Sequence, residues 1–492
     1  MRGAIAVNTH EFKNARFILV SSLILFLCVH TFAAVNLIQN GPSLTVDLKS
    51  TAMDETAAGN WFRPFYFRLS GNIAAPYWSC VLSCFYMLAT VLILSHLFQY
   101  KSKAAVILAS GIVILNPASI ALFAAHIHSA DASFLSLLLS AIGITLLFSV
   151  SRFKRAFALP CFILAIGLDL SLCTVPLTLI LLLRIDRLLH NESLPAHFAL
   201  KALLTWIISV SVSLLCLVFL VQRYRIEPAV TVTPQYSFFA DSIHAALAAY
   251  YPRFTAYPHL LGVTQVFLFC WLIGFLIYSQ KVEFQVLIRA LIAFVLCLVI
   301  SSVVFLFTSF VPQVHISYYL PCLLACSMLN FPSKRLYTRT SLRIVSLALG
   351  GAVFLGQIVF ANQVYLKKGL EFQSTLSVMT RVLDRVEQTP GFIPGETPVA
   401  MLGNLDQSPI SSPHEGFEHL EAFEAASNHL SINTEKQSTT YIWQILGYPL
   451  NLVSDFDKQR LLNTIDLKDV PVFPAEGSIF WKDDVLIICL SK

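Results

Sequence analysis

The sequence predicts an all-α polytopic membrane protein with about eleven transmembrane helices and a small α/β domain at its C-terminus. Hydrophobic residues make up 56 % of the 492 residues, charged residues make up only 12 %, and the mean hydropathy is +0.71. Soluble proteins carry about 25 % charged residues. One water-soluble core cannot bury this much apolar surface, so a bilayer is the expected solvent.

Apolar segments of suitable length give the positions of the spans. The first, 17–38, follows Arg2, Lys13 and Arg16 and is longer than the apolar core of a signal peptide, so we interpret it as a transmembrane helix. Further single spans are predicted at about 77–98, 104–125, 132–150, 202–222, 259–280, 290–310, 316–331 and 344–366.

The apolar stretch 156–184 is predicted to form two short helices rather than one span. It is interrupted by Asp169, and both of its flanks are basic. A single crossing would place one basic flank outside, whereas a hairpin keeps both flanks inside. With this hairpin the N-terminus and all basic loops are cytoplasmic. The loops 39–76 and 223–258 and the C-terminal domain are then outside, which in a bacterium is the periplasmic side of the inner membrane.

The C-terminal region differs in charge from the rest of the chain. Residues 367–492 carry 10 Lys and Arg against 17 Asp and Glu, whereas residues 1–366 carry 23 against 11. We therefore predict a transmembrane domain over 1–366 and a periplasmic α/β domain over 367–492. The expected elements of the second domain are helices near 371–388, 417–428 and 456–466 and strands near 398–404 and 485–490. Because the positive charge belongs to the membrane part, nucleic-acid binding is excluded.

The first outside loop has an acidic pair that is followed within ten residues by Trp-x-Arg-Pro, and these residues offer three chemical roles. A carboxylate can accept a proton from a hydroxyl group, an arginine can bind a phosphate in a two-pronged geometry, and an indole offers a platform for a sugar ring or a lipid head group. The alternative is a solvated loop whose Trp and Arg anchor the membrane interface. A short interfacial helix is expected across 64–73. The candidates in this loop are Asp47, Asp54, Glu55, Trp61, Arg63 and Arg68.

Other polar residues lie near the outside ends of the predicted helices. They are His126, His128, Asp131, Asp169, His315, Arg223 and Arg225. The His-x-His pair could share a metal only with a third ligand, and is otherwise a structural or head-group contact. Asp169 is either a functional ionisable group or a helix cap at the tip of the hairpin. His315 and the two arginines are either phosphate ligands or interfacial polar residues.

Common cofactor motifs are missing from the sequence. It contains no Walker-type glycine loop, no GxSxG elbow, no HExxH and no dinucleotide fingerprint. Ten of the eleven cysteines lie in apolar spans without metal-binding spacing, which indicates packing residues and no metal site. The energy for any reaction must therefore come with the substrate, and the need for a divalent cation is left open.

Several motifs together resemble those of a known family. A first span is followed by Asp54-Glu55 and by Trp-Phe-Arg-Pro at 61–64, and Asn-Pro stands at 116–117. The segment 470–479, Val-Pro-Val-Phe-Pro-Ala-Glu-Gly-Ser-Ile, is similar to a Pro-x-[Tyr/Phe]-Pro-x-x-Gly-Ser-Ile ending. Over essentially the whole chain these features resemble the bacterial O-antigen glucosyltransferases of the serotype-converting type, which are GT-C membrane glycosyltransferases that use polyprenyl-phosphate sugars.

The chain also departs from the pattern of this family. Phe62 replaces the glycine of the family's Gly-Arg-Pro, and the interval from Asp54 to Arg63 is shorter than usual. Asp47 fits the usual interval better but lacks an acidic neighbour. His315 stands where an arginine is expected at the mouth of the tenth span.

The resemblance implies transfer of a hexose, glucose in the family, from undecaprenyl-phosphate-hexose to a lipid-linked O-antigen or related polysaccharide. It implies inversion at the anomeric carbon, contact with membrane lipid, and association with the donor synthase and flippase. Asp54, with Asp47 and Glu55 as rivals, would accept the proton. Two other classes stay open: a flippase of a lipid-linked sugar, disfavoured because no inverted repeat is visible, and an assembly protein whose C-terminal domain recruits a partner.

Overall fold

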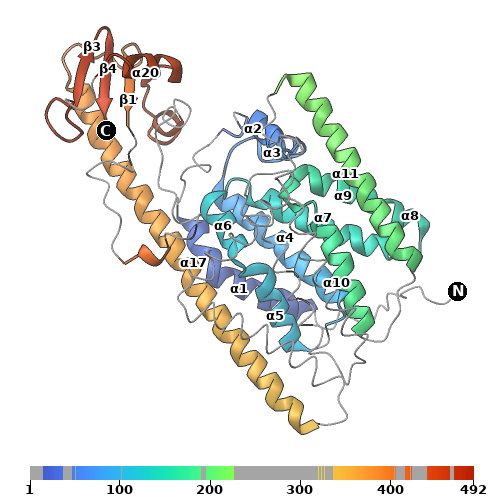
Figure 1. Cartoon of the computed structure of the whole chain (residues 1–492). Coiled ribbons are helices and arrows are strands. Elements are labelled where there is room, and N and C mark those ends of the chain that lie inside the picture. Colours follow the sequence, from blue (N-terminus) through green and yellow to red (C-terminus); the bar gives the residue numbers. More distant parts are fainter. Residues whose placement is uncertain are drawn as a thin grey trace.

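The computed structural model describes residues 15–36, 47–49, 51–100, 102–189, 196–226, 320, 323, 326, 336–403, 405, 416–420, 423, 440–465 and 470–491. Within these residues the protein is mostly helical and ends in a small sheet (Figure 1). The predicted spans 259–280, 290–310 and 316–331 lie outside the described residues, apart from three single positions, and so does most of the loop 223–258. The total of eleven spans remains a prediction.

Helices α1 to α11 form a bundle (Figure 1). Its main helices are α1 (Ala15–Val35), α4 (Pro76–Leu97), α5 (Lys103–Ile114), α6 (Pro117–Ala125), α7 (Ala130–Leu147), α8 (Arg152–Ala156), α9 (Ala158–Leu168), α10 (Val175–Leu189) and α11 (Ala196–Tyr224). Helix α7 contacts both α4 and α9, and α1 contacts α4 and α5, so these helices share one apolar core.

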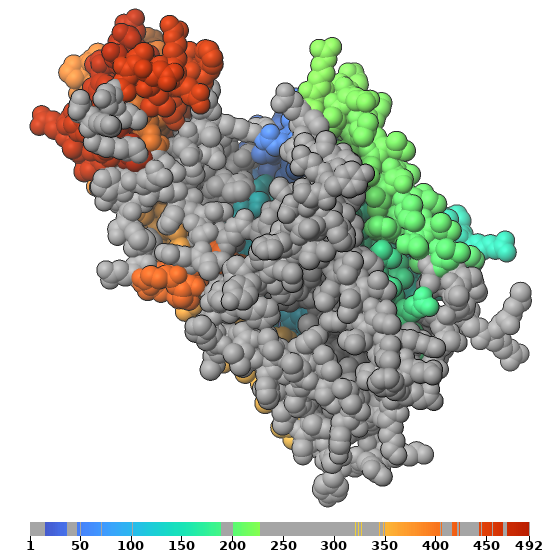
Figure 2. Space-filling view, in the orientation of Figure 1, coloured from blue at the N-terminus to red at the C-terminus, as the bar shows by residue number. Residues whose placement is uncertain are grey.

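Five segments of the described residues are long and apolar enough to cross a membrane. They are Ala15–Val35, Pro76–Leu97, Lys103–Ala125, Ala130–Leu147 and Leu200–Tyr224. Helix α11 lies along one edge of the molecule (Figure 2), where Ile207, Leu215 and Phe219 expose 44 %, 68 % and 65 % of their surface. Large apolar side chains exposed along a whole helix are what contact with lipid requires.

Two predicted segments prove to be divided helices. The span predicted at 104–125 breaks between α5 and α6, where Asn116 caps α6 by accepting from the Ser119 amide at 2.8 Å and Pro117 takes the first helical position. The two short helices predicted within 156–184 are confirmed, whereas the return of the chain to the same side of the membrane stays a prediction. Helices α9 and α10 are joined by the turn η4 (Leu170–Leu172), which Asp169 precedes.

Helix α17 (Leu336–Glu387) joins the bundle to the C-terminal sheet. The sequence predicts two helices here, 344–366 and 371–388, but the structure has one continuous helix, so the predicted domain boundary at 366 falls inside it. The reason is that Gly369 is the single weak helix former between the two predictions, and one glycine costs only about 1 kcal/mol.

The N-terminal part of α17 packs closely on α5. A Cβ added to Gly111 would lie 2.0 Å from the Phe354 ring, and one added to Gly350 would lie 2.3 Å from Leu108. Small residues at such contacts let helices approach closely in apolar surroundings. The C-terminal part of α17 packs instead on the sheet, through residues such as Met379, Val382 and Val386.

The C-terminal sheet has four strands in the order β2-β1-β4-β3. They are β1 (Pro398–Leu402), β2 (Asn451–Leu452), β3 (Ile479–Lys482) and β4 (Val485–Cys489), accompanied by α20 (Asp455–Leu462), η8 (Glu418–Leu420) and the π-helical turn η9 (Thr440–Ile445). Strand β1 is parallel to β2 and β4, whereas β3 is antiparallel to β4. The predicted strands near 398–404 and 485–490 and the helix near 456–466 are confirmed. Strands β2 and β3 were not predicted from the sequence.

A buried hydrogen bond ties α1 to α17. The Nε2 of His30 lies 3.1 Å from the Ile114 carbonyl, and its Nδ1 lies 2.8 Å from the Tyr365 hydroxyl. A carbonyl can only accept, so Nε2 carries the proton and Nδ1 accepts from Tyr365.

Replacing Tyr365 by Phe leaves the buried Nδ1 of His30 unsatisfied. We expect the free energy of unfolding to fall by about 1–3 kcal/mol, measured as a lower thermal midpoint of the full chain in detergent. The exposed Tyr77→Phe is the matched control, because this ring is 64 % exposed. Equal midpoints for both variants would contradict a stabilising role for the bond.

Candidate functional site

The segment between α1 and α4 folds onto the bundle. It contains α2 (Ala52–Ala57), α3 (Arg63–Phe67) and η3 (Arg68–Ser70). Asp47 pairs with Ile73, and the Leu48 amide donates to the Asn72 carbonyl at 2.9 Å, so the two ends of the segment meet. The Oδ1 of Asp47 also accepts from the Lys49 amide at 3.0 Å. This segment is therefore a closed structural unit, and the predicted short helix across 64–73 is present as α3 and η3.

Trp61 anchors this segment to two helices of the bundle. Its Nε1 donates to Ser213 Oγ of α11 at 2.7 Å. Its ring lies on Gly167 at the end of α9, where an added Cβ would come within 2.6 Å of Trp61 Cε2. The neighbouring Phe62 amide donates to the Gly167 carbonyl at 2.7 Å. The indole predicted to hold a sugar is therefore in use as an anchor between helices.

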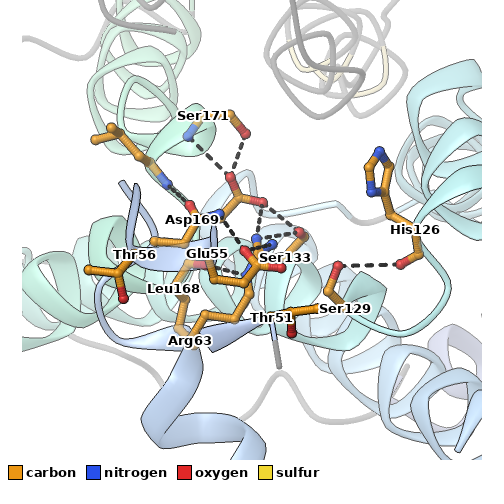
Figure 3. A network of polar contacts seen from close by, with 12 residues as sticks. Thr51, Glu55, Thr56, Arg63, His126, Ser129, Ser133, Leu168, Asp169 and Ser171 are labelled. Carbon is orange, nitrogen blue, oxygen red and sulfur yellow. Dashed lines mark hydrogen bonds and ion pairs between the residues drawn. The ribbon is translucent and has the colours of Figure 1, made fainter. Parts of the chain in front are cut away.

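Arg63 lies at the centre of a buried ion cluster (Figure 3). Its Nη1 is 2.9 Å from Glu55 Oε2, and its Nη2 is 3.2 Å from Asp169 Oδ2. Its Nε donates to the Leu168 carbonyl at 2.9 Å. The side chains of Arg63, Asp169 and Glu55 are 4 %, 3 % and 13 % exposed. We call these three residues the carboxylate–arginine cluster.

Polar neighbours donate further hydrogen bonds to both carboxylates. The hydroxyls of Ser133 and Ser171 donate to Oδ2 and Oδ1 of Asp169, and the Ser171 amide donates to Oδ1 at 3.1 Å. Asn60 Nδ2 donates to Glu55 Oε2 at 2.9 Å. Two carboxylates share one guanidinium, so this cluster carries one formal negative charge that these donors stabilise. Asp169 is thus both the cap of η4 and an ion-pair partner.

Only one member of the acidic pair, Glu55, belongs to the carboxylate–arginine cluster. Asp54 and Glu55 both lie in the first turn of α2. Glu55 turns inward to Arg63, whereas Asp54 is exposed at the surface. Successive residues of an α-helix point about 100° apart, so one side chain of the pair can be buried while the other stays accessible.

Tyr66 of α3 is the centre of a second group of polar side chains. The Tyr66 hydroxyl donates to Asp131 Oδ2 at 2.7 Å and is 3.3 Å from the Tyr86 hydroxyl. Burial, followed by the charge of Asp131, raises the pKa of Tyr66 well above its ordinary value. Asp131 Oδ1 and His128 Nδ1 are buried, and neither has a hydrogen-bond partner among the residues that the structure describes.

The two histidines before α7 are neutral at physiological pH. Burial, reinforced by the neighbouring His126 and Arg63, lowers the pKa of His128 to about 3. Burial also lowers the pKa of His126, although Glu55 and Asp169 oppose the shift. The two ring centres lie 6.4 Å apart. Among the described residues, no group of three or more His, Cys, Asp or Glu side chains is placed to hold a metal ion.

Three of the remaining predicted phosphate ligands are exposed at the surface. Arg68 is exposed, with its guanidinium 5.1 Å from the centre of the Phe65 ring. Arg223 and Arg225 are exposed at the end of α11. His315 lies outside the described residues.

Sequence reasoning identified Glu55, Arg63 and Asp169 separately but did not predict that they meet. It missed the serines and Asn60 altogether. Asn60 lies inside the segment 53–64 that was singled out, which is a usable signal, whereas Ser133 and Ser171 have no distinguishing pattern. Comparisons with protein-family models, with curated proteins and with solved structures found no match to this chain.

Replacing Gly167 by Ala forces Trp61 from its position. We expect a lower thermal midpoint of the full chain in detergent, together with greater quenching of tryptophan fluorescence by a water-soluble quencher. Gly351→Ala is the matched control, because a Cβ there would meet nothing within 4 Å. If Gly167→Ala and Gly351→Ala behave alike, Trp61 is not held by this contact.

Replacing Arg63 by Gln strands two buried carboxylates. We expect a loss of about 3–5 kcal/mol in the free energy of unfolding, measured by denaturation of the full chain in detergent. Adding Asp169→Asn to this variant should restore part of the loss, because it removes one stranded charge. Arg68→Gln, at an exposed arginine, should leave stability unchanged. A double variant no more stable than Arg63→Gln alone would argue against the charge explanation.

Proposed function

We propose that this protein is a membrane glycosyltransferase that moves a hexose from undecaprenyl-phosphate-hexose to a lipid-linked O-antigen or related polysaccharide on the periplasmic face. The observation that carries the proposal is the split acidic pair: Asp54 is exposed beside a buried cluster that fixes its helix. A carboxylate that must deprotonate a substrate has to be both accessible and held in position.

The surroundings of Asp54 support this role. Helices α2 and α3 lie at the end of the bundle where α1 ends, where α4 begins and where the α9–α10 turn lies (Figure 1). In the proposed topology this end is periplasmic. Lipid-linked donors keep their prenyl tail among apolar helices while the phosphate and sugar reach the membrane surface, where this segment would meet them.

In the proposed reaction, the acceptor hydroxyl attacks the anomeric carbon of the donor. Asp54 takes the hydroxyl proton as the new C–O bond forms. The bond from the anomeric carbon to the phosphate oxygen breaks, and its electron pair leaves with the undecaprenyl phosphate. Direct displacement inverts the anomeric centre. Glu55, Arg63 and Asp169 act as positioning residues, since their charged atoms already bind one another.

Charge that develops on the departing phosphate needs cationic or hydrogen-bonding partners. Arg63 was the first candidate from the sequence, but its guanidinium is engaged with two carboxylates and is nearly inaccessible. Arg68, Arg223 and Arg225 are exposed and take over this role in the proposal. His315 remains a candidate.

Replacing Asp54 by Asn should abolish transfer while leaving protein abundance unchanged. We expect a loss of at least about 100-fold in hexose addition, the typical contribution of a positioned base. The measurement is mass spectrometry and linkage analysis of surface polysaccharide from cells that express each variant at matched levels.

Two neighbouring variants serve as controls. Asp47→Asn should retain transfer. Asp47 pairs with Ile73 through its backbone, and the amide oxygen of Asn can still accept from the Lys49 amide. Glu55→Gln should lower abundance and transfer together, because it weakens the anchoring of α2. Full activity of Asp54→Asn would remove this residue from the role. Unchanged polysaccharide from wild-type cells that contain the lipid-linked donor would instead favour a flippase or an assembly function.

A further inference from the structure

One end of the C-terminal sheet presents exposed apolar side chains. Trp443, Ile393 and Trp481 expose 54 %, 52 % and 40 % of their surface. Both indole N–H groups are already satisfied: Trp443 Nε1 donates to the Leu450 carbonyl at 2.8 Å, and Trp481 Nε1 donates to the Pro390 carbonyl at 3.1 Å. These bonds fix the orientation of the rings while part of their surface stays open to a partner.

These three side chains border the same end of the sheet. Trp481 lies on the edge strand β3, and Trp443 is tied to the residue before the opposite edge strand β2. The segment 390–396 runs between them, since Pro390 contacts Trp481 and Glu396 accepts from Asn451 of β2 at 3.1 Å. Three strand spacings separate the two edges, about 14 Å. We call Trp443, Ile393 and Trp481 the aromatic row.

The aromatic row lies at the end of the sheet away from the helical bundle. Strand β1 starts eleven residues after the last residue of α17 and packs on this helix, since Val399 and Met401 share a core with Val378 and Val386. It is parallel to β4, whose C-terminal end lies on the side of the sheet nearer the bundle (Figure 1), so β1 also runs toward the bundle. The N-terminal part of α17 contacts the bundle, so the start of β1 is distal to it. Figure 2 shows the C-terminal domain projecting at one corner of the molecule.

The negative charge around the aromatic row favours a neutral partner over an anionic one. Exposed carboxylates of Glu396, Asp483 and Asp484 lie at the same end of the sheet as the aromatic row, and residues 367–492 carry seven more acidic than basic residues (17 against 10). An anionic lipid surface would be repelled. A chain of neutral sugars fits, because the C–H faces of the rings stack on indoles and the hydroxyls donate to carboxylates.

We propose that the aromatic row binds the polysaccharide acceptor along several consecutive sugar units. This inference rests on the proposed function and adds an acceptor-holding surface remote from Asp54. Such a surface raises the local concentration of the polymer end near the membrane, as linked binding sites do.

The test is binding of polysaccharide to the full chain in lipid nanodiscs. The probe is surface polysaccharide of the producing cells, released from its lipid by mild acid. Each of Trp443→Ala and Trp481→Ala should weaken binding about fivefold to tenfold, and the double variant should weaken it further. Phe456→Ala is the matched control, because this ring is 79 % exposed on α20, which follows the other end of β2.

The outcomes separate this inference from the proposed function. Asp54→Asn should bind polysaccharide like the wild type while failing to transfer hexose. If the wild type transfers hexose but the double tryptophan variant binds polysaccharide as tightly as the wild type, the aromatic row is not the binding surface. The proposed enzymatic function is then unaffected. Binding to phosphatidylglycerol vesicles that depends on the tryptophans, without polysaccharide binding, would also overturn the aromatic row as a polysaccharide site and would indicate a lipid-contact surface. Equal losses from Phe456→Ala would show that the effect is nonspecific.

Discussion

The guanidinium of Arg63 is the constraint on which the candidate site depends. It pairs with Glu55 of α2, eight residues earlier, and joins this segment to the distant end of α9 through the Leu168 carbonyl and the adjacent Asp169. A buried arginine tolerates such surroundings only when its donors are satisfied, and here each of its three nitrogens has an acceptor. The way in which the segment between α1 and α4 sits on the bundle therefore depends on this side chain, together with the Trp61 anchor.

The sequence predicts local features of this fold well. Apolar length located α1, α4, α7 and α11, and Asp169 together with the basic flanks of 156–184 correctly indicated two short helices in place of one span. Both predictions rest on properties that short stretches of chain carry themselves. The continuous α17 was missed because a change in charge near residue 366 suggested a boundary, whereas helix continuity depends on backbone propensity and packing.

The candidate site was less predictable because it is assembled across the chain. Glu55 and Arg63 are eight residues apart and could be paired from sequence, but the approach of Asp169 depends on how α9 meets α3. Trp61 shows the same limit, since a sugar platform and a packing anchor have identical sequence signatures and differ only in what lies opposite the ring. The structure shows Trp61 as a packing anchor, because Gly167 has no side chain and so leaves room for the indole.

The burial of Glu55 and the exposure of Asp54 have a common cause, and this bears on how such a site can evolve. A single turn of helix with adjacent carboxylates can commit one of them to an internal ion pair and present the other outward at a fixed angle. The anchoring residue then limits where the accessible carboxylate can be, independently of any substrate contact. For the proposed glycosyltransferase this means that the site keeps its geometry when the sugar or the acceptor changes, because the residues that set the geometry are buried among one another.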